Sequence, residues 1–210
     1  DFIKFYNFDE NNTSVVYPGT SNIQSSKKKL NFDFKFFLYV GSRKKYKNFE
    51  IILKALSLKK EILQDYKLIC FGNENFGSNE LELMEKLNIK KKDIILFNGS
   101  DEILQGLYRE AEALIYPSLN EGFGFPPLEA MSLACPVIVS QNEAIQEAVG
   151  ECGFYFDPKD EKNLLEKIEK IINKNFDRVN LIQNGIKRSN QFNWNKTGSD
   201  IEKIYEKVLG

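Results

Sequence analysis

The sequence predicts an α/β fold, in which a Rossmann-like, doubly wound parallel sheet is followed by long C-terminal helices. Short apolar runs alternate along the chain with longer amphipathic segments, as strands and helices do in βαβ units. Most of the short runs are continuously apolar, which is typical of parallel strands covered on both faces. A chain of 210 residues, 42% of them hydrophobic and 28% charged, is long enough to bury a large core.

The elements follow one another as right-handed crossovers require. Runs expected to form strands lie at residues 14–17, 36–40, 66–71, 93–97, 113–116, 136–140 and 153–156. Helical periodicity predicts intervening helices at residues 48–59, 79–87, 101–111, 128–134 and 142–148. The same periodicity continues through the tail, at residues 162–173, 176–189 and 194–208. Proline, glycine, serine and lysine gather in residues 18–35, which indicates a linker there.

Composition excludes several classes of function. The formal net charge of −1 gives no support for a nucleic-acid partner held by bulk electrostatics. No apolar run approaches the roughly 20 residues that span a bilayer, and no signal peptide is visible. Histidine is absent, which removes a histidine base, a histidine metal ligand and any serine–histidine or cysteine–histidine nucleophile pair.

The cysteines, Cys70, Cys135 and Cys152, are widely spaced and indicate neither a disulfide framework nor a zinc site. Cys70 lies in an apolar run and Cys135 precedes a proline, so both are expected to be buried, reduced thiols. The cytoplasm is therefore the expected location. The chain begins at Asp1 without a methionine, so we expect a fragment or a cut domain.

The turns after the predicted strands carry glycine, hydroxyl and charged residues. In open α/β sheets, ligands bind beyond the carboxyl ends of the strands. The strand ends here continue into residues 41–43, 72–74, 98–100, 117–121 and 140–142. Because these turns follow parallel strands, we expect them to converge on one rim that holds a ligand.

The turn between Glu121 and Glu129 has the strongest functional pattern. Gly122 and Gly124 let the backbone approach a ligand, and the following prolines pre-set a first helical turn. A helix N-terminus suits phosphate, whereas the two carboxylates accept hydrogen bonds from hydroxyls. The combination favours a nucleotide sugar. The alternative is a surface loop with a glutamate that interacts with its own helix dipole.

Two further turns are candidates for the same ligand. Arg43 and Lys47 follow a buried strand and together can neutralise a diphosphate leaving group, although a solvated basic loop would have the same composition. The turn at residues 97–103 leads into a helix that Ser100 or Asp101 is expected to cap. Its backbone and Ile103 can equally line a nucleobase slot.

The whole string from Glu121 to Met131, Glu-Gly-Phe-Gly-Phe-Pro-Pro-Leu-Glu-Ala-Met, resembles the signature of retaining GT-B glycosyltransferases of the group 1, family 4 type. The segment from Tyr39 to Phe49 is similar to the diphosphate-binding turn of that family. Further similarities lie at residues 137–140, 146–147, 153–158 and 192–194, and the resemblance covers essentially residues 1–209. It implies that this chain is the C-terminal half of a GT-B fold.

The resemblance also implies roles for particular residues. Glu121 would contact the hydroxyls of the donor sugar, and Glu129 the hydroxyls of the ribose. Arg43 and Lys47 would hold the diphosphate and, with Glu121, form the catalytic group. The implied donor site comprises Gly41, Ser42, Arg43, Lys47, Asn98, Gly99, Ser100, Ile103, Glu121, Gly122, Phe123, Gly124, Phe125 and Glu129. No metal and no cofactor are implied, because cations and a helix terminus neutralise a UDP- or GDP-linked donor.

The same resemblance predicts a division of the chain. Residues 1–24 would end an N-terminal domain and form the crossover strand, residues 25–35 the linker, and residues 36–210 the nucleotide-sugar-binding domain. The missing N-terminal domain would bind a glycan or lipid-linked acceptor, so the isolated domain is expected to transfer little sugar. Peripheral association of the full-length enzyme with the inner face of the plasma membrane is a further expectation.

Two alternatives keep this fold and change the function. One is a regulatory module that binds nucleotide without transfer, and the presence of Arg43, Lys47, Glu121 and Glu129 together argues against it. The other is a nucleotide-sugar epimerase or a phosphorylase, whose families lack the complete glutamate string. A phosphorylase also requires a pyridoxal lysine and a much longer chain.

Overall fold

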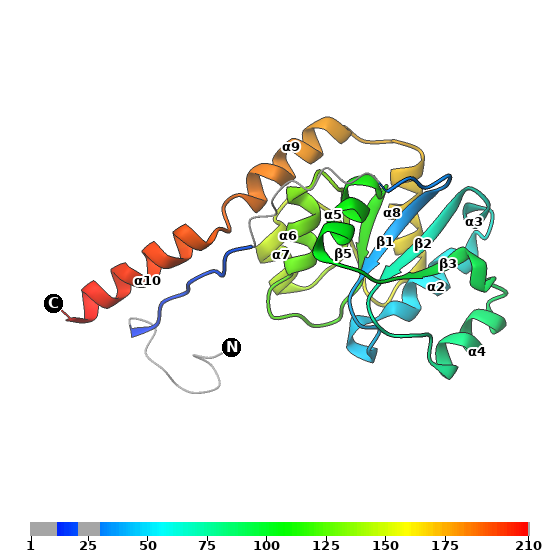
Figure 1. Ribbon diagram of the computed structural model, residues 1–210, viewed down its shortest axis with the longest axis horizontal. Coiled ribbons are helices and arrows are strands. Elements are labelled where there is room, and N and C mark those ends of the chain that lie inside the picture. The colour runs from blue at the N-terminus through cyan, green and yellow to red at the C-terminus, as the bar shows by residue number, and fades with distance from the viewer. Residues whose placement is uncertain (1–11, 21–29, 210) are drawn as a thin grey trace. The chain divides into compact units, whose positions relative to one another are not determined.

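The computed structural model describes residues 12–20 and 30–209. The chain divides into two compact units: Asp1–Asn22 together with Asn190–Gly210, and Ile23–Ser189. The larger unit contains the sheet, whose strands are β1 (Lys35–Val40), β2 (Tyr66–Phe71), β3 (Ile94–Phe97), β4 (Ala113–Tyr116), β5 (Val137–Ser140) and β6 (Phe154–Phe156). Their order is β3-β2-β1-β4-β5-β6, and each neighbouring pair is parallel (Figure 1). The predicted doubly wound parallel sheet is therefore confirmed.

Helices connect the strands and cover the sheet. The helices of the larger unit are α2 (Phe49–Leu58), α3 (Ile62–Asp65), α4 (Ser78–Lys86), α5 (Asp101–Glu110), α6 (Phe125–Ser132), α7 (Glu143–Val149), α8 (Glu161–Ile172) and α9 (Arg178–Ser189). Helix α2 packs against α4 and α8, whereas α6 packs against α5, α7 and α9. Short 3₁₀ turns, η2 (Lys45–Lys47) and η3 (Lys91–Asp93), precede α2 and β3.

The central strands are buried along their length, as their apolar runs predict. In β1, Phe36, Phe37, Leu38 and Tyr39 are all almost inaccessible to solvent, and in β4 Ala113–Tyr116 are buried throughout. Burial on both faces explains why these runs do not alternate between apolar and polar residues. Cys70 and Cys135 are buried free thiols, as predicted, whereas Cys152 is partly exposed.

The predicted boundaries agree closely with the structure except in a few places. The helix predicted at residues 128–134 begins earlier, at Phe125, because Pro126 and Pro127 occupy its first turn, where an N–H is not needed. The short helix α3 has no clear sequence signal and was not expected. Residues 25–29 of the predicted linker lie outside the described residues, and the division into domains stays a prediction.

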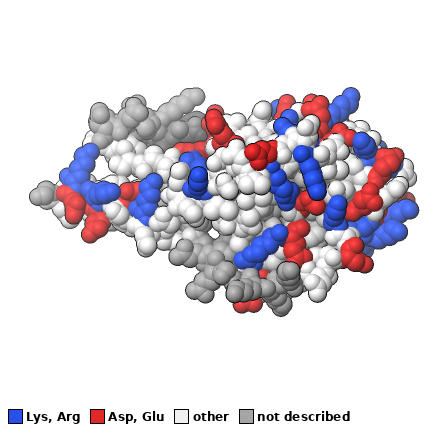
Figure 2. All heavy atoms as spheres, turned by 90° about the horizontal axis from the view of Figure 1, so that it is seen from above, with Lys and Arg blue, Asp and Glu red and all other residues white. Residues whose placement is uncertain are grey.

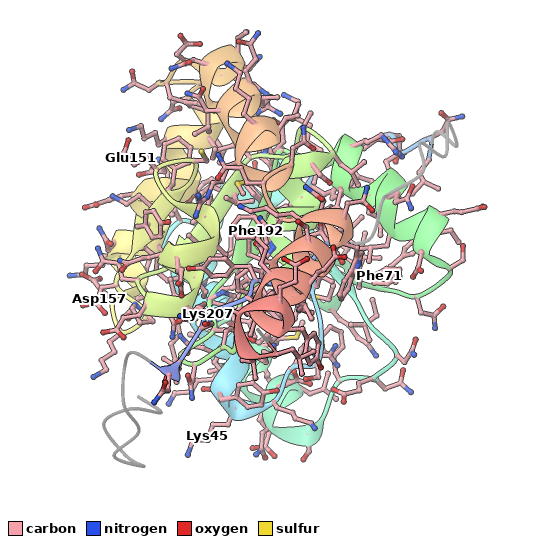
Figure 3. All side chains as sticks on the ribbon, turned by 90° about the vertical axis from the view of Figure 1, so that its left-hand side faces the viewer. Lys45, Phe71, Glu151, Asp157, Phe192 and Lys207 are labelled. Carbon is pink, nitrogen blue, oxygen red and sulfur yellow. The ribbon has the colours of Figure 1, made fainter. Side chains whose placement is uncertain are left out.

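In its described part, the smaller unit consists of residues 12–20 and a C-terminal segment that contains α10 (Trp194–Leu209). Thr20 forms an isolated parallel bridge with Asn193, and its N–H donates to the carbonyl of Phe192 at 3.0 Å. Figure 3 displays the side chains of this segment around the labelled residues Phe192 and Lys207.

The strand predicted at residues 14–17 is wrong, because residues 13–19 form no strand. The hydroxyl of Thr197 in α10 donates to the carbonyl of Tyr17 at 2.8 Å, so a helix and not a strand bonds this extended segment. Pro18 has no N–H with which to continue a ladder. An extended apolar run alone does not reveal this difference.

One face of the molecule carries charges of both signs. On the face shown in Figure 2, lysine and arginine side chains are interspersed with aspartate and glutamate and do not gather by sign. None of the helices that the structure describes is both long enough and apolar enough to span a bilayer.

Candidate functional site

The candidate site lies where the strand order reverses. The sheet is built outward from β1 through β2 to β3, and from β4 through β5 to β6. Neighbouring strands β1 and β4 therefore send their following connections in opposite directions, and in open α/β sheets ligands bind beyond the carboxyl ends of the strands at such a switch point. The two turns at this switch point are residues 41–48, after β1, and residues 117–124, after β4.

Two of the predicted site residues meet across this switch point. Nζ of Lys47 lies 2.6 Å from Oε1 of Glu121, and the two side chains are only 16% and 12% exposed. The ammonium group also lies 5.5 Å from the ring centroid of Tyr116 at the end of β4. The pair is thus a charge-assisted hydrogen bond in a largely desolvated place, where it is stronger than on an open surface.

The surroundings of Glu121 favour its charged form. Burial by itself would raise its pKa, but the hydrogen bond from Lys47 and the nearby hydroxyls of Ser118 and Tyr116 outweigh burial, so the pKa lies below its ordinary value. Burial raises the pKa of Tyr116, which keeps that hydroxyl protonated beside the carboxylate. Glu121 is therefore an ionised hydrogen-bond acceptor at neutral pH.

Residues of the turn after β1 form hydrogen bonds with the turn that carries Glu121. Nδ2 of Asn48 donates to the carbonyl of Pro117 at 3.2 Å and to that of Pro158, after β6, at 2.8 Å. The N–H of Leu119 donates to the carbonyl of Tyr46 at 2.8 Å. The sequence analysis assigned Asn48 only to the start of a helix. The signal that could have revealed its role is an asparagine between a basic turn and an apolar helix.

Residues at the end of β5 and directly after it donate hydrogen bonds to the same turn. Asn142 caps α7 with its side-chain oxygen, while its Nδ2 donates to the carbonyl of Leu119 at 3.0 Å. Oγ of Ser140 donates to the carbonyl of Ser118 at 2.5 Å. The predicted rim turn at residues 140–142 therefore supports the central turn by direct hydrogen bonds.

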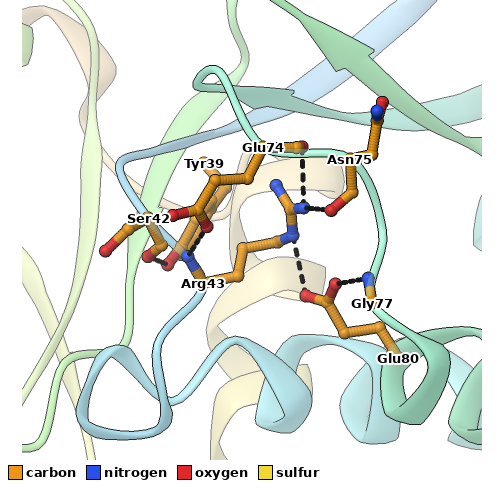
Figure 4. A network of polar contacts seen from close by, with 7 residues as sticks. All are labelled: Tyr39, Ser42, Arg43, Glu74, Asn75, Gly77 and Glu80. Carbon is orange, nitrogen blue, oxygen red and sulfur yellow. Dashed lines mark hydrogen bonds and ion pairs between the residues drawn. The ribbon is translucent and has the colours of Figure 1, made fainter.

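Arg43 has a different set of partners. Its Nε lies 2.7 Å from Oε1 of Glu80 in α4, and its Nη2 donates to the carbonyls of Glu74 and Asn75 at 2.9 Å and 2.8 Å (Figure 4). Its side chain is only 3% exposed. Arg43 and Lys47, predicted to share one anion, are thus bonded to different carboxylates here. The assignment of Arg43 to a diphosphate stays a prediction.

The other residues predicted in the first turn have local roles in the structure. The N–H of Gly41 donates to the carbonyl of Phe71 at the end of β2, at 3.0 Å. The carbonyl of Ser42 accepts from the hydroxyl of Tyr39 at 2.7 Å (Figure 4). These bonds fix the start of the turn that leads to Arg43 and Lys47.

The glycine-rich turn ends at the N-terminus of α6, as predicted. Gly124 is the N-cap, with φ of 125°, a conformation that L side chains rarely adopt. Positions 126 and 127 are prolines without N–H groups, so the helix terminus keeps the N–H groups of Gly124 and Phe125, and those of residues 122–123 precede it in the turn. The aromatic rings of Phe123 and Phe125 contact each other with centroids 5.5 Å apart. Gly122 is exposed.

Glu129 lies in α6 and is partly buried. Oε2 of Glu129 accepts from the hydroxyl of the buried Tyr108 in α5, at 3.0 Å. Burial raises the pKa of Glu129 and the charge of Asp101 raises it further, while the bond from Tyr108 opposes both. Asp101 begins α5, and α5 packs against α6.

The turn predicted to line a base lies directly before α5. Asn98, Gly99 and Ser100 are exposed, and Ser100 is the N-cap residue of α5, although its side chain makes no capping hydrogen bond. Gly99 packs closely on the first turn of the helix, since an added Cβ would lie 2.6 Å from Cδ1 of Ile103. The segment is thus an exposed, backbone-rich edge beside a partly buried isoleucine.

The structure therefore brings Lys47, Glu121 and the N-terminus of α6 to the same switch point. Glu129 lies near the turn at residues 98–103, whereas Arg43 is engaged by Glu80. Within the described residues, no group of three or more histidine, cysteine, aspartate and glutamate side chains is arranged to hold a metal ion. The arrangement can accept a phosphate at the cations and helix terminus and hydroxyls at the two carboxylates.

Comparisons with known proteins agree with this reading of the fold. The family described as Glycosyl transferases group 1 matches residues 21–188. The O-antigen chain mannosyltransferase RfbU of Salmonella typhimurium is 34% identical over 169 residues, which cover 80% of this chain and 46% of that protein. The O-antigen chain mannosyltransferase B of Escherichia coli is 31% identical over 173 residues, which cover 81% of this chain and 45% of that protein.

A solved structure extends the likeness of fold. A glycosyltransferase from Rickettsia africae aligns with a TM-score of 0.84 and 19% identity, over 99% of this chain and 60% of that chain. The chain spans about half the length of the curated relatives described above. Since the family match covers most of the chain, the chain belongs to the group 1 glycosyl transferases.

Proposed function

We propose that this chain is the donor-binding domain of a retaining, metal-independent hexosyltransferase of the family 4 type. The observation that carries the proposal is the Lys47–Glu121 pair at the switch point, beside the N-terminus of α6. A cation and a helix terminus suit a diphosphate, and a carboxylate held in its charged form suits sugar hydroxyls.

In the transfer, the oxygen of an acceptor hydroxyl forms a bond to the anomeric carbon, and the hydroxyl proton is released. The diphosphate leaves with the electron pair of its own bond to that carbon, so negative charge develops on the oxygen that carried the sugar. Lys47 and the N–H groups of residues 122–125 stabilise that charge in a partly desolvated place. A metal ion is then not required for this task. Glu121 accepts hydrogen bonds from hydroxyls of the transferred sugar and orients its anomeric carbon.

Arg43 is proposed as the second cation for the diphosphate. Glu80 is its counter-ion, at 2.7 Å. A bound diphosphate would compete with Glu80 for the guanidinium, while the carbonyls of Glu74 and Asn75 go on accepting from its Nη2. Gly41 and Ser42 complete this part of the donor site through their backbone.

The nucleoside is proposed to lie between α5 and α6. Glu129 accepts hydrogen bonds from the ribose hydroxyls, and the backbone of residues 98–100 together with Ile103 lines the base. A base held mainly by backbone groups is compatible with either a UDP- or a GDP-linked donor. The tests below therefore include both nucleotides.

The acceptor is proposed to be a glycan or lipid-linked sugar bound by a second, N-terminal domain of the complete enzyme. The relatives named O-antigen chain mannosyltransferases support a hexosyl transfer in polysaccharide biosynthesis. We place the enzyme in the cytoplasm, with peripheral association at the inner face of the plasma membrane. The isolated chain is expected to bind nucleotide and to transfer little or no sugar.

The test is an assay of the full-length enzyme for sugar transfer and for donor hydrolysis with UDP- and GDP-hexoses. Turnover with one of them, lost on Glu121→Ala, supports the proposal. Nucleotide binding without turnover of any donor would favour the alternative, a regulatory module that keeps the site and has no transfer activity.

A further inference from the structure

We propose that Asn48 is a positioning residue, which sets the geometry of the Lys47–Glu121 pair by joining the turns that follow β1, β4 and β6. The inference rests on the proposed function only for what the pair does, not for how it is held. It also gives a role to the Asp157-Pro158 segment, which contributes no side chain to the donor site.

The backbone of Asn48 explains how one side chain reaches two distant turns. Asn48 has φ of 54° and ψ of 34°, in the left-handed region, where asparagine is tolerated better than most residues. This conformation ends η2 and begins α2 within one residue. Because the chain turns there, the amide of Asn48 lies at the switch point and not along the face of α2.

Both donors of the amide are used. Its Nδ2 donates to the carbonyls of Pro117 at 3.2 Å and of Pro158 at 2.8 Å. An NH₂ group has two donor hydrogens, so the side chain can satisfy two carbonyls at once, which neither serine nor aspartate can do. No neighbouring group in the described turns duplicates this link to Pro158.

The hydrogen bonds between the turns after β1 and β4 are made by the residues on either side of Lys47 in the chain. Lys47 lies directly before Asn48, and the N–H of Leu119 donates to the carbonyl of Tyr46 at 2.8 Å. The turns after β1 and β4 are thus joined on both sides of Lys47, and Glu121 lies two residues beyond the second link. These links fix the backbone positions from which Lys47 and Glu121 project, so the two side chains have fewer conformations to search before they reach their 2.6 Å contact.

The sharpest test replaces Asn48 while keeping its backbone conformation. Asn48→Gly tolerates positive φ and removes both donors. Asn88→Gly is the matched control, because Asn88 is also left-handed, with φ of 53°, and follows α4. Lys47→Ala is the positive control, because it removes the partner of Glu121 outright.

The measured quantity is the pKa of the Glu121 carboxyl group. NMR of its side-chain carbon monitors the ionisation of this group during a pH titration of the chain. Among the described residues, the groups that act on the Glu121 carboxyl are Lys47, Ser118, Tyr116 and Tyr39, of which Lys47 is the cation. We expect Asn48→Gly to raise this pKa toward its ordinary value, as Lys47→Ala does, and Asn88→Gly to leave it unchanged. An unchanged pKa in folded Asn48→Gly would overturn the proposal.

A nucleotide titration separates this inference from the proposed function. We expect Asn48→Gly to bind UDP or GDP about tenfold more weakly than the unmodified chain, as loss of one well-placed charged contact would do. If the unmodified chain binds neither nucleotide, the proposed function fails while the pKa still decides the role of Asn48.

Folding provides the remaining control. If Asn48→Gly does not fold while Asn88→Gly does, the amide bonds hold the fold as a whole, and the assignment of Asn48 as a positioning residue of the site is overturned.

Discussion

The ammonium group of Lys47 and the carboxylate of Glu121 are 2.6 Å apart although the residues are separated by 74 positions in the chain. They follow β1 and β4, the two strands between which the sheet reverses its order. Sequence reasoning assigned one to a phosphate and the other to a sugar. Their contact makes each the counter-ion of the other.

Lys47→Ala should weaken binding of nucleoside diphosphates about tenfold or more, because it removes one charge-assisted contact to phosphate. Binding of the nucleoside monophosphate should change less, so the preference for UDP over UMP, or GDP over GMP, should fall. Calorimetric titration measures both. Lys45→Ala, two residues earlier in the same turn, is the control, and an equal effect there would argue for a diffuse basic loop.

Glu121→Ala should mainly abolish transfer in the full-length enzyme, since its carboxylate is proposed to orient the sugar and not to hold the nucleotide. Nucleotide affinity should stay within a few-fold of the unmodified protein. Steady-state kinetics with the donor, paired with UDP or GDP titration, separate the two effects. A variant that transfers sugar at an undiminished rate would remove Glu121 from the proposed site.

Glu129→Gln should weaken nucleotide binding and stabilise the free protein at pH 8. The pKa of Glu129 is raised by burial, so the folded state binds its proton more tightly than the unfolded state. Stability from this group is therefore present at low pH and is lost as the pH rises from the ordinary glutamate range through the raised value. A neutral side chain avoids that loss.

Denaturant unfolding of Glu129→Gln and of the unmodified chain between pH 4 and pH 8 measures this difference. The gain in the free energy of unfolding should be largest at pH 8 and vanish toward pH 4. Glu82→Gln, at an exposed position of α4, is the control and should show no such trend. If Glu129→Gln binds nucleotide as tightly as the unmodified chain, Glu129 does not hold the ribose.

Arg43→Ala should lower the free energy of unfolding by about 1–3 kcal/mol, because Glu80 and two backbone carbonyls lose a buried partner. Glu80→Gln tests the competition with ligand more directly. The neutral amide binds Arg43 less strongly than the carboxylate does, so the affinity for diphosphate should rise several-fold while the free energy of unfolding falls slightly. Unchanged diphosphate affinity in both variants would leave Arg43 with a structural role alone.

Gly124→Ala should cost about 1–3 kcal/mol of stability, because its φ of 125° is strained for any residue with a Cβ. It should also weaken nucleotide binding, since it tilts the N–H groups at the start of α6. Gly122→Ala is the matched control in the same turn. An added Cβ there meets no atom within 4 Å, so its effect on stability should stay within about 0.5 kcal/mol.

Much of the fold could be predicted because continuous apolar runs identify buried parallel strands almost independently of context. The rim of turns that holds the candidate site could be predicted from the same pattern, because the carboxyl ends of parallel strands lie at one edge of the sheet. The strand predicted at residues 14–17 was wrong because its hydrogen-bond partner is α10, and a single run of residues does not reveal its partner.

The site could be predicted as a set of residues but not as a set of contacts. The glycine, proline and glutamate residues around Gly124 predicted the helix terminus, because each has a local conformational reason to occur there. The partners of Arg43 and Asn48 lie 37 and up to 110 positions away, and depend on how α4 and the turn after β6 pack. No local pattern encodes those choices.

The central claim is that a nucleotide diphosphate binds at the switch point between β1 and β4. Its most direct test is an NMR titration of the chain with UDP and GDP, following the backbone amides. Saturable shifts are expected at Lys47, at residues 122–125 and at Glu129 with at least one of the two nucleotides. Saturable shifts confined to other parts of the sheet, or none at millimolar nucleotide, would contradict it.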